Sequence, residues 1–233
     1  MSIVLAIDTS AAACSAAVLD QARVHAQGSR VMERGHAEAL LPMVEQVMAA
    51  AALDFRDLDL IAVTRGPGAF TGIRIGLAAA RGLAFASGKP CVGVETLSAL
   101  AEPLLARDPG RPLLAVMDTK RGDFYAEIFG GGPPDHPPAG PSAVDAAGLV
   151  RLVRALGPAG DRALLVIGDA AETAVRALGE AGIAAEADLA QRTPDACAVG
   201  RLALSVWRAG ETVPLPQPLY LRPPQVSEPN DRR

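Results

Sequence analysis

The chain has 233 residues, half of them apolar, which is enough for one large domain or for two of about 110 residues each. Aromatic residues make up only 3%, so Ala, Leu and Val must fill most of the core. A net charge of -4 and a pI near 5.4 argue against a protein that binds nucleic acid alone over a broad surface.

The cysteines and the N-terminus indicate where the protein works. Cys14, Cys91 and Cys197 are far apart and form no CxxC pair, which fits unpaired thiols in a reducing compartment. The apolar run Ile3–Ile7 ends at Asp8 and has no cationic region before it, so it predicts a strand and not a signal peptide. No run reaches the roughly 18 apolar residues of a membrane helix. We therefore expect a cytoplasmic protein without membrane contact.

The first half is predicted to be a three-stranded meander followed by alternating helices and strands. Short turns separate its first strands, which is typical of antiparallel neighbours. The expected elements are strands Ile3–Ile7, Cys14–Leu19 and about Arg23–Gln27, helix His36–Leu53, strand Leu60–Thr64, helix about Thr71–Phe85, strand Cys91–Val94 and helix Thr96 to about Leu105.

Helix His36–Leu53 carries apolar residues beyond a single stripe. Leu40, Val44 and Val47 recur at helical spacing, and Leu41 and Met43 widen the apolar area. Two interpretations remain open: a second contact face, or a well-buried core helix.

A glycine-rich segment, Thr64–Gly76, joins a strand to the next helix. Such a turn directs backbone N–H groups and the positive end of a helix dipole at one point, which suits an anion. It lacks the Gly-Lys-Ser/Thr of a P-loop and is not Gly-x-Gly-x-x-Gly. An anion site and a plain strand–helix turn are both compatible with it.

The helix after this turn has a ridge of small residues at every fourth position. A smooth ridge suits either a helix pressed onto its own sheet or a helix–helix docking surface. From Leu60 to Val94 there are four basic residues and no acidic one, and such a run is usually a solvated rim. The ridge residues are Gly72, Gly76, Ala80 and Ala84, and the basic residues are Arg65, Arg74, Arg81 and Lys89.

The second half repeats the opening of the first. Ile3–Ser10 matches Leu113–Lys120 in pattern without a gap, after the turn-rich linker Arg107–Pro112, so both halves place Asp-Thr at a turn. The further expected elements are strand Phe124–Phe129, an exposed loop Gly130–Pro141, helix about Ser142–Leu156, strand Leu164–Ile167, helices about Ala170–Gly179 and Pro194–Ala209, and an extended tail Val213–Asn230 with one docked piece, Leu219–Leu221.

Two such halves define the architecture of the actin, Hsp70 and sugar-kinase class, an α/β fold of two tandem β-β-β-α-β-α-β-α domains. We place these domains at 1–107 and 108–233, with a final helix free to pack back on the first domain. In that class the two Asp-bearing turns, here at Asp8 and Asp118, grip a nucleotide between the domains. The second turn has bulky residues where glycines would let backbone amides approach phosphates. The sequence therefore predicts a degraded nucleotide grip.

Four motifs resemble the bacterial TsaB (YeaZ) family, and the resemblance covers roughly the first 125 residues. The C-terminal Tyr220-Leu221-Arg222 is also similar, while the middle of the second half is generic. The four motifs are Ile7-Asp8-Thr9-Ser10, the run from Arg34 to Pro42, the run from Gly66 to Gly76, and Gly93-Val94-Glu95-Thr96-Leu97.

The resemblance implies a non-catalytic subunit that pairs with the TsaD transferase. With a TsaE ATPase, that complex places a threonylcarbamoyl group on N6 of the adenosine beside the tRNA anticodon. It also implies that tRNA is met only through the complex, and that the partner face builds a homodimer when the chain is alone. The residues expected on that face are His36, Leu40, Met43, Val44, Val47, Gly72, Arg74, Gly76, Ala80, Arg81 and Ala84.

TsaD relatives bind a metal through His-x-x-x-His, and no two of His25, His36 and His136 have that spacing. His36 is expected to start or pack a helix and not to catalyse. We expect no metal and no required cofactor, with at most weak ATP or ADP binding in the complex at a vestigial nucleotide or anion site. The residues of that site are Asp8, Thr9, Ser10, Gly66, Gly68 and Asp118.

Two other functions compete with the scaffold. An ATP-dependent small-molecule kinase or ATPase of the same fold needs tight nucleotide binding and a cleft carboxylate such as Asp8 or Asp118. A peptidase needs a nucleophile and a base, and Ser10 or Ser98 with His36 forms no supported triad.

Overall fold

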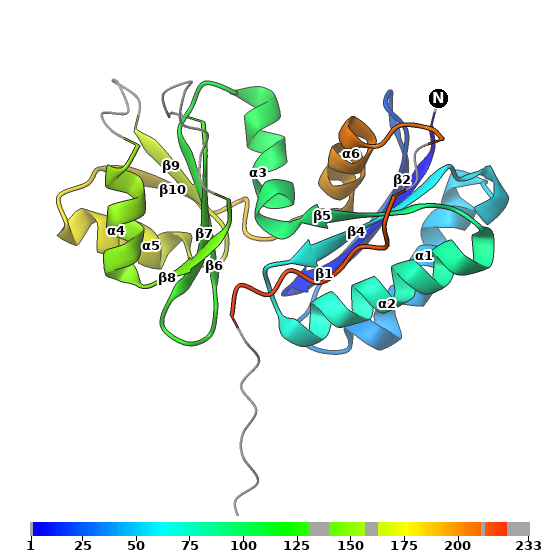
Figure 1. Cartoon of the computed structure of the whole chain (residues 1–233), viewed down its shortest axis with the longest axis horizontal. Helices are drawn as coiled ribbons and strands as arrows, with labels where there is room; N and C mark the ends of the chain where they lie inside the picture. The colour runs from blue at the N-terminus through cyan, green and yellow to red at the C-terminus, as the bar shows by residue number, and fades with distance from the viewer. Residues whose placement is uncertain (1, 131–139, 157–162, 211–212, 223–233) are drawn as a thin grey trace, which may run out of the picture.

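Two five-stranded mixed sheets organise the chain, one in each half (Figure 1). The computed structural model describes residues 2–130, 140–156, 163–210 and 213–222. Over these residues the element order is β-β-β-α-β-α-β-α twice, with one short 3-10 turn, Phe55–Asp57, after the first helix. The predicted α/β order is therefore confirmed.

The first sheet has the strand order β3-β2-β1-β4-β5. Its central strand β1 pairs antiparallel with β2 and parallel with β4, and every residue of β1 is buried. Burial on both faces explains why the opening run of the sequence is continuously apolar. The strands are β1 (Val4–Ala11), β2 (Ala13–Leu19), β3 (Val24–Val31), β4 (Leu60–Gly66) and β5 (Cys91–Glu95).

Helices cover both faces of the first sheet. Helices α1 (His36–Ala51) and α2 (Phe70–Ser87) lie side by side on one face, where Leu5 and Ile7 of β1 meet them. Helices α3 (Thr96–Arg107) and α6 (Ala196–Val206) pack on the opposite face.

The second sheet has the strand order β10-β9-β6-β7-β8. Its central strand β6 pairs antiparallel with β7 and parallel with β9, as β1 does with β2 and β4. The strands are β6 (Leu113–Asp118), β7 (Phe124–Phe129), β8 (Ser142–Val144), β9 (Leu164–Ile167) and β10 (Ala185–Asp188), and helices α4 (Ala146–Arg154) and α5 (Ala171–Glu180) cover one face.

Two helices join the halves. Helix α3 packs Leu97 and Leu100 against the second sheet while its Ala99 belongs to the core of the first. Helix α6 follows the second sheet in sequence but packs on β1 and β2, where Gly200 lies against Leu19 and the Ala196 N–H donates to Ser15 Oγ at 3.0 Å. The final helix therefore belongs to the core of the first half.

Some boundaries differ from those predicted. Strand β3 extends to Val31. The helix expected over Ser142–Leu156 begins only after Asp145, whose carboxylate caps α4 by accepting from the Gly148 N–H at 2.7 Å, and the residues Ser142–Val144 before it form β8. Strand β10 had not been located in the sequence. Residues 131–139 of the expected loop and 223–230 of the expected tail lie outside the described residues.

The three cysteines are buried and unpaired, as expected. Burial raises the pKa of each thiol to about 11. Within the described part of the chain, no helix combines the length and the hydropathy that a membrane crossing requires.

Candidate functional site

The glycine turn before α2 is fastened to the end of β1. The Ala69 N–H donates to the Ser10 carbonyl at 2.8 Å, and Thr9 Oγ1 donates to the Gly72 carbonyl at 2.7 Å. A Cβ added to Gly68 would collide with the Ser10 carbonyl, and one added to Gly72 with the Thr9 carbonyl. These two glycines therefore let α2 begin directly against the Asp-Thr-Ser segment.

The small-residue ridge of α2 faces its own sheet. Gly72, Gly76, Ala80 and Ala84 are all buried, and a Cβ on Gly76 would stand 2.5 Å from Thr9 Oγ1. Of the two interpretations of the ridge, the helix pressed onto its own sheet is correct. The chain itself covers these four residues, which the sequence analysis had placed on the partner face.

The predicted partner residues of α1 are largely core residues too. Leu40, Val44 and Val47 are at most 3% exposed and belong to the core beneath α1, while Met43 is half-buried. His36 is 9% exposed, and its Nε2 lies 3.1 Å from the Ala11 carbonyl. That contact fits the role of a residue that starts and packs the helix.

The outward face of α2 carries a different stripe. At helical spacing it presents Thr71, Ile75, Ala78, Gly82 and Phe85, of which Ile75 is half-buried and the other four are exposed. Phe85 is 92% exposed. This outer stripe is mostly apolar, with small residues at Ala78 and Gly82, and within the described residues nothing lies within 4 Å of a Cβ added at Gly82.

Asp8 does not reach the cleft between the halves. Its carboxylate is fully buried, where Oδ1 accepts from Ser10 Oγ and Thr64 Oγ1, both at 2.6 Å, and Oδ2 has no hydrogen-bond partner among the described residues. Burial raises the pKa of this carboxyl group above its ordinary value. The Asp8 carboxylate is therefore not among the groups that line the cleft.

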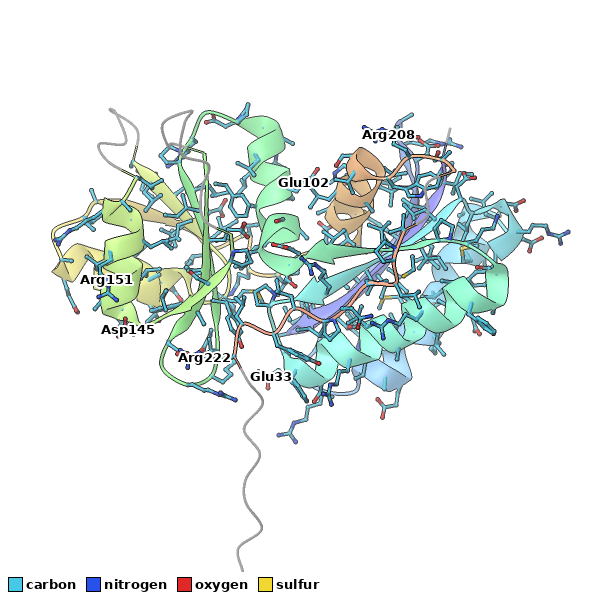
Figure 2. All side chains as sticks on the ribbon, in the orientation of Figure 1. Glu33, Glu102, Asp145, Arg151, Arg208 and Arg222 are labelled. Carbon is cyan, nitrogen blue, oxygen red and sulfur yellow. The ribbon has the colours of Figure 1, made fainter. Side chains whose placement is uncertain are left out.

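A cleft of about 810 Å³ separates the halves. The N-termini of α1 and α2 both border it, and neither Gly35 nor Ala69 supplies a capping side chain, so free N–H groups of two helices lie at its wall. Figure 2 shows Glu33, one of its lining residues, close to the junction of the halves. The charged lining residues are Glu33, Arg34, Glu38, Asp118, Lys120, Arg121 and Asp169, with His36 beside them.

The opposite wall of the cleft is the β6–β7 hairpin. Lys120 there has a positive φ of 62°, and its ammonium lies 3.1 Å from the Asp118 carboxylate, which raises the pKa of Lys120. The Asp118 N–H donates to Asp169 Oδ1 at 2.8 Å, and burial raises the pKa of the Asp169 carboxyl. The cleft thus combines cations and helix N-termini with several carboxylates.

The residues predicted for a vestigial anion site are divided by the structure. Ser10, Gly68 and Asp118 line the cleft, whereas Asp8 and Thr9 are buried behind α2 and Gly66 lies against the Leu219 carbonyl. Sequence reasoning placed Lys120 and Arg121 in the second turn but did not identify Arg34 as a lining residue. The sequence signal for the free N–H groups at the start of α1 was Gly35, because a glycine in the capping position has no side chain that could accept from them.

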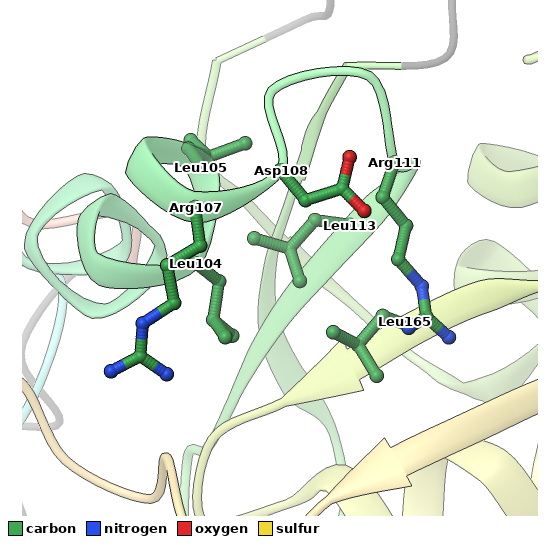
Figure 3. A pocket seen from close by; sticks show the side chains of 7 residues that line it. All are labelled: Leu104, Leu105, Arg107, Asp108, Arg111, Leu113 and Leu165. Atoms are coloured by element: carbon green, nitrogen blue, oxygen red, sulfur yellow. The ribbon is translucent and has the colours of Figure 1, made fainter.

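A second, smaller cavity of about 90 Å³ lies at the end of α3 (Figure 3). Leu104, Leu113 and Leu165 form an apolar floor, and the guanidinium groups of Arg107 and Arg111 stand on two sides of it. Arg111 also pairs with Glu186 at 2.5 Å. Among the described residues there is no group of three or more His, Cys, Asp or Glu that could hold a metal ion.

Comparison with known proteins identifies relatives of the first half most clearly. The family model for TsaD, tRNA N6-adenosine threonylcarbamoyltransferase, matches residues 17–132. The tRNA threonylcarbamoyladenosine biosynthesis protein TsaB of Escherichia coli is 36% identical over 122 residues, which are 52% of each chain. The match thus spans about half the length of that curated relative.

Solved structures extend the similarity over nearly the whole chain. A Pseudomonas aeruginosa protein described as similar to peptidase YeaZ has 31% identity and a TM-score of 0.78, over 95% of this chain and 100% of its own. YeaZ from Pseudomonas aeruginosa has 28% identity and a TM-score of 0.73, over 94% and 100%. Together with the topology, these matches confirm the predicted fold class.

Proposed function

The chain belongs to the TsaB (YeaZ) family, and from that premise we propose that it is the non-catalytic scaffold of a complex that makes threonylcarbamoyladenosine in tRNA. In this proposal it pairs with a TsaD-type transferase and a TsaE-type ATPase, and it meets tRNA only within the complex. The name of the Escherichia coli relative, which places that protein in this pathway, supports the proposal.

The side chains most suited to catalysis are engaged elsewhere, which supports a scaffold. Ser10 Oγ donates to Asp8, and His36 contacts the Ala11 carbonyl, so neither is set up as a nucleophile or a base toward a substrate. The Asp8 carboxylate, which a kinase or ATPase of this fold would need in its cleft, is buried.

The observation that carries the proposal is the outer stripe of α2. At the middle of this stripe Ala78 and Gly82 let another helix approach closely, and the exposed Phe85 beside them supplies apolar area for it to cover. Leu41, 48% exposed, adds apolar area from the neighbouring α1. We propose this stripe, and not the buried ridge, as the surface shared by a TsaD-type partner and a second copy of the chain.

Gly82→Glu tests the surface without disturbing the fold, because nothing lies within 4 Å of a Cβ added there. Gly179→Glu is the matched control: it is an exposed helical glycine of α5 with equally open surroundings. Size-exclusion chromatography with light scattering would compare both variants and the wild-type chain, each alone and mixed with the TsaD-type protein of the same organism.

The wild-type chain and Gly179→Glu should each form a homodimer that gives way to a heterodimer in the mixture, and Gly82→Glu should remain monomeric in both. A wild-type chain whose molar mass does not change when the TsaD-type protein is added would refute the scaffold proposal. If Gly82→Glu and Gly179→Glu pair equally well, the scaffold proposal still holds, but the outer stripe of α2 is not the docking surface.

A weak nucleotide site is the alternative function that the cleft favours. Two uncapped helix N-termini together with Arg34, Lys120 and Arg121 attract phosphate, while Asp118 and Asp169 repel it. We therefore propose at most weak ATP or ADP binding, with no cofactor required. Calorimetric titration with ATP would test this, and tight binding would favour a kinase or ATPase.

We also propose a cytoplasmic location, the site of the pathway's tRNA substrate. Three buried, unpaired cysteines support it, since such thiols persist in a reducing compartment.

A further inference from the structure

A segment near the C-terminus, Val213–Arg222, runs back along the first half beside α2 (Figure 1). We call it the strap. The Leu219 N–H donates to the Arg65 carbonyl at 2.7 Å, and Arg81 Nε donates to the Pro216 carbonyl at 3.1 Å. The strap thus occupies hydrogen-bonding groups at the end of β4 and on one side of α2.

Two glycines of the first half make room for the strap. A Cβ on Gly93, in the interior of β5, would stand 2.6 Å from Pro216 Cβ, and one on Gly66 would stand 2.5 Å from the Leu219 carbonyl. A glycine inside a strand commonly marks the close approach of another segment. Pro216 itself is buried. The first sheet therefore has glycines at the two positions where the strap approaches it most closely.

The strap ends in an aromatic and guanidinium cluster at the edge of the cleft. The Tyr220 ring lies 5.2 Å from that of Phe70, a lining residue of the cleft. Arg74 stands 3.8 Å over the Phe70 ring, and its Nε donates to Tyr220 Oη at 2.9 Å. These contacts hold the strap to the first wall of the cleft.

The last described residue of the strap reaches the opposite wall. Arg222 pairs with Asp123 in the β6–β7 hairpin, and Figure 2 shows Arg222 where the strap meets the second half. Asp123 is 8% exposed and also accepts from Thr119 Oγ1, whose residue lines the cleft. The ion pair therefore joins the strap to the part of the hairpin that forms the cleft wall.

We propose that the strap is a latch between the two halves: Tyr220 fixes it to the first half, Arg222 fixes it to the second, and its release lets the cleft open. Every contact that defines the latch lies within one chain. Its release also frees Arg74 and Arg81 on α2, because Tyr220 and the Pro216 carbonyl occupy their guanidinium groups.

A charge swap in the full chain tests the latch. The variants are Arg222→Asp, Asp123→Arg and the double variant with both changes, and Tyr220→Ala tests the other end without altering the hairpin. Leu215→Ala is the control, because Leu215 lies in the same segment with a side chain that is 56% exposed. Hydrogen exchange measured by mass spectrometry reports on the strap, residues 213–222, and on the hairpin, residues 118–123.

Each charge reversal should speed exchange in both the strap and the hairpin by about tenfold, the effect of losing a charge-assisted contact. The double variant should return both rates to within about threefold of wild type, given that a restored pair recovers most of its coupling. Tyr220→Ala should speed exchange in the strap, and Leu215→Ala should match wild type.

Two results would overturn the latch. One is a wild-type strap that already exchanges as fast as unstructured chain. The other is a strap released by Arg222→Asp while the hairpin keeps its wild-type rate.

Discussion

Replacing Glu127 by Gln should make the protein more resistant to unfolding above neutral pH but not below pH 5. Glu127 lies on β7 at the junction of the halves, 9% exposed, and its Oε2 has no hydrogen-bond partner among the described residues. Burial, with a further contribution from the charge of Glu95, raises the pKa of this carboxyl to about 7 from an ordinary 4.5.

The direction of the effect follows from proton linkage. Between pH 4.5 and 7 the folded chain keeps a proton on Glu127 that the unfolded chain releases, so the free energy of unfolding falls as pH rises through this window. At about 1.36 kcal/mol per pKa unit, the difference between the two pKa values sets an upper limit of about 3 kcal/mol on the loss of unfolding free energy. Because the charged side chain can relax toward solvent at the edge of the junction, we expect about 1–2 kcal/mol.

The assay is urea unfolding at pH 5, 6, 7 and 8, followed by the fluorescence of Trp207, the single tryptophan, which is 9% exposed. The free energy of unfolding of Glu127→Gln minus that of wild type should increase by about 1–2 kcal/mol between pH 5 and pH 8. Glu45→Gln, at an exposed position of α1, is the control and should leave the pH profile unchanged. A difference that is constant with pH would refute the assignment.

Three further changes are predicted. Gly76→Leu should lower the free energy of urea unfolding by about 3 kcal/mol or more, because even a Cβ there would stand 2.5 Å from Thr9 Oγ1. A Gly76→Leu variant as stable as wild type would contradict the close packing of α2 on β1. Gly82→Ala should stabilise by about 0.8–1 kcal/mol, measurable as a higher Tm, since the site is open and alanine is the better helix former. Asp8→Asn should gain stability relative to wild type as pH rises from 4 to 8, because burial raises the pKa of Asp8 and Asn carries no charge; a relative loss over that range would show that the carboxylate is stabilised in the core.

The fold was predictable because it repeats a strong local pattern. An Asp-Thr pair recurs toward the ends of β1 and β6, and the central strands are continuous apolar runs buried on both faces. Strand β10 escaped prediction, because Ala185–Asp188 is short, half acidic and no more than half-buried at the sheet edge. The strand is defined by its parallel pairing with β9, and the residues of β10 alone do not show that pairing.

The cleft was harder to predict than the fold. Its walls come from segments more than eighty residues apart, such as Arg34 and Lys120, and periodicity within one element does not show which ends will meet. Likewise, the turn predicted at Asp8-Thr9-Ser10 comes later, because β1 continues to Ala11, and the motif does not show the direction of each side chain. Ser10 lines the cleft, but its hydroxyl donates to Asp8, whose buried carboxylate also accepts from Thr64.

Helix α2 shows why a small-residue stripe alone does not identify an interface. The helix carries small residues on two faces, one with Gly76 and one with Gly82. The hydrogen bond from Thr9 to Gly72 decides between them, because it fixes the first face against β1 and leaves the second outward.

The two faces therefore call for opposite experiments on one helix. A large side chain at Gly76 strikes β1 within the same chain, so any loss of pairing there would only report a damaged fold. The same kind of change at Gly82 meets nothing in the chain's described residues, so a loss of pairing there has to arise between molecules. Of the two glycines, only Gly82 can separate docking from folding.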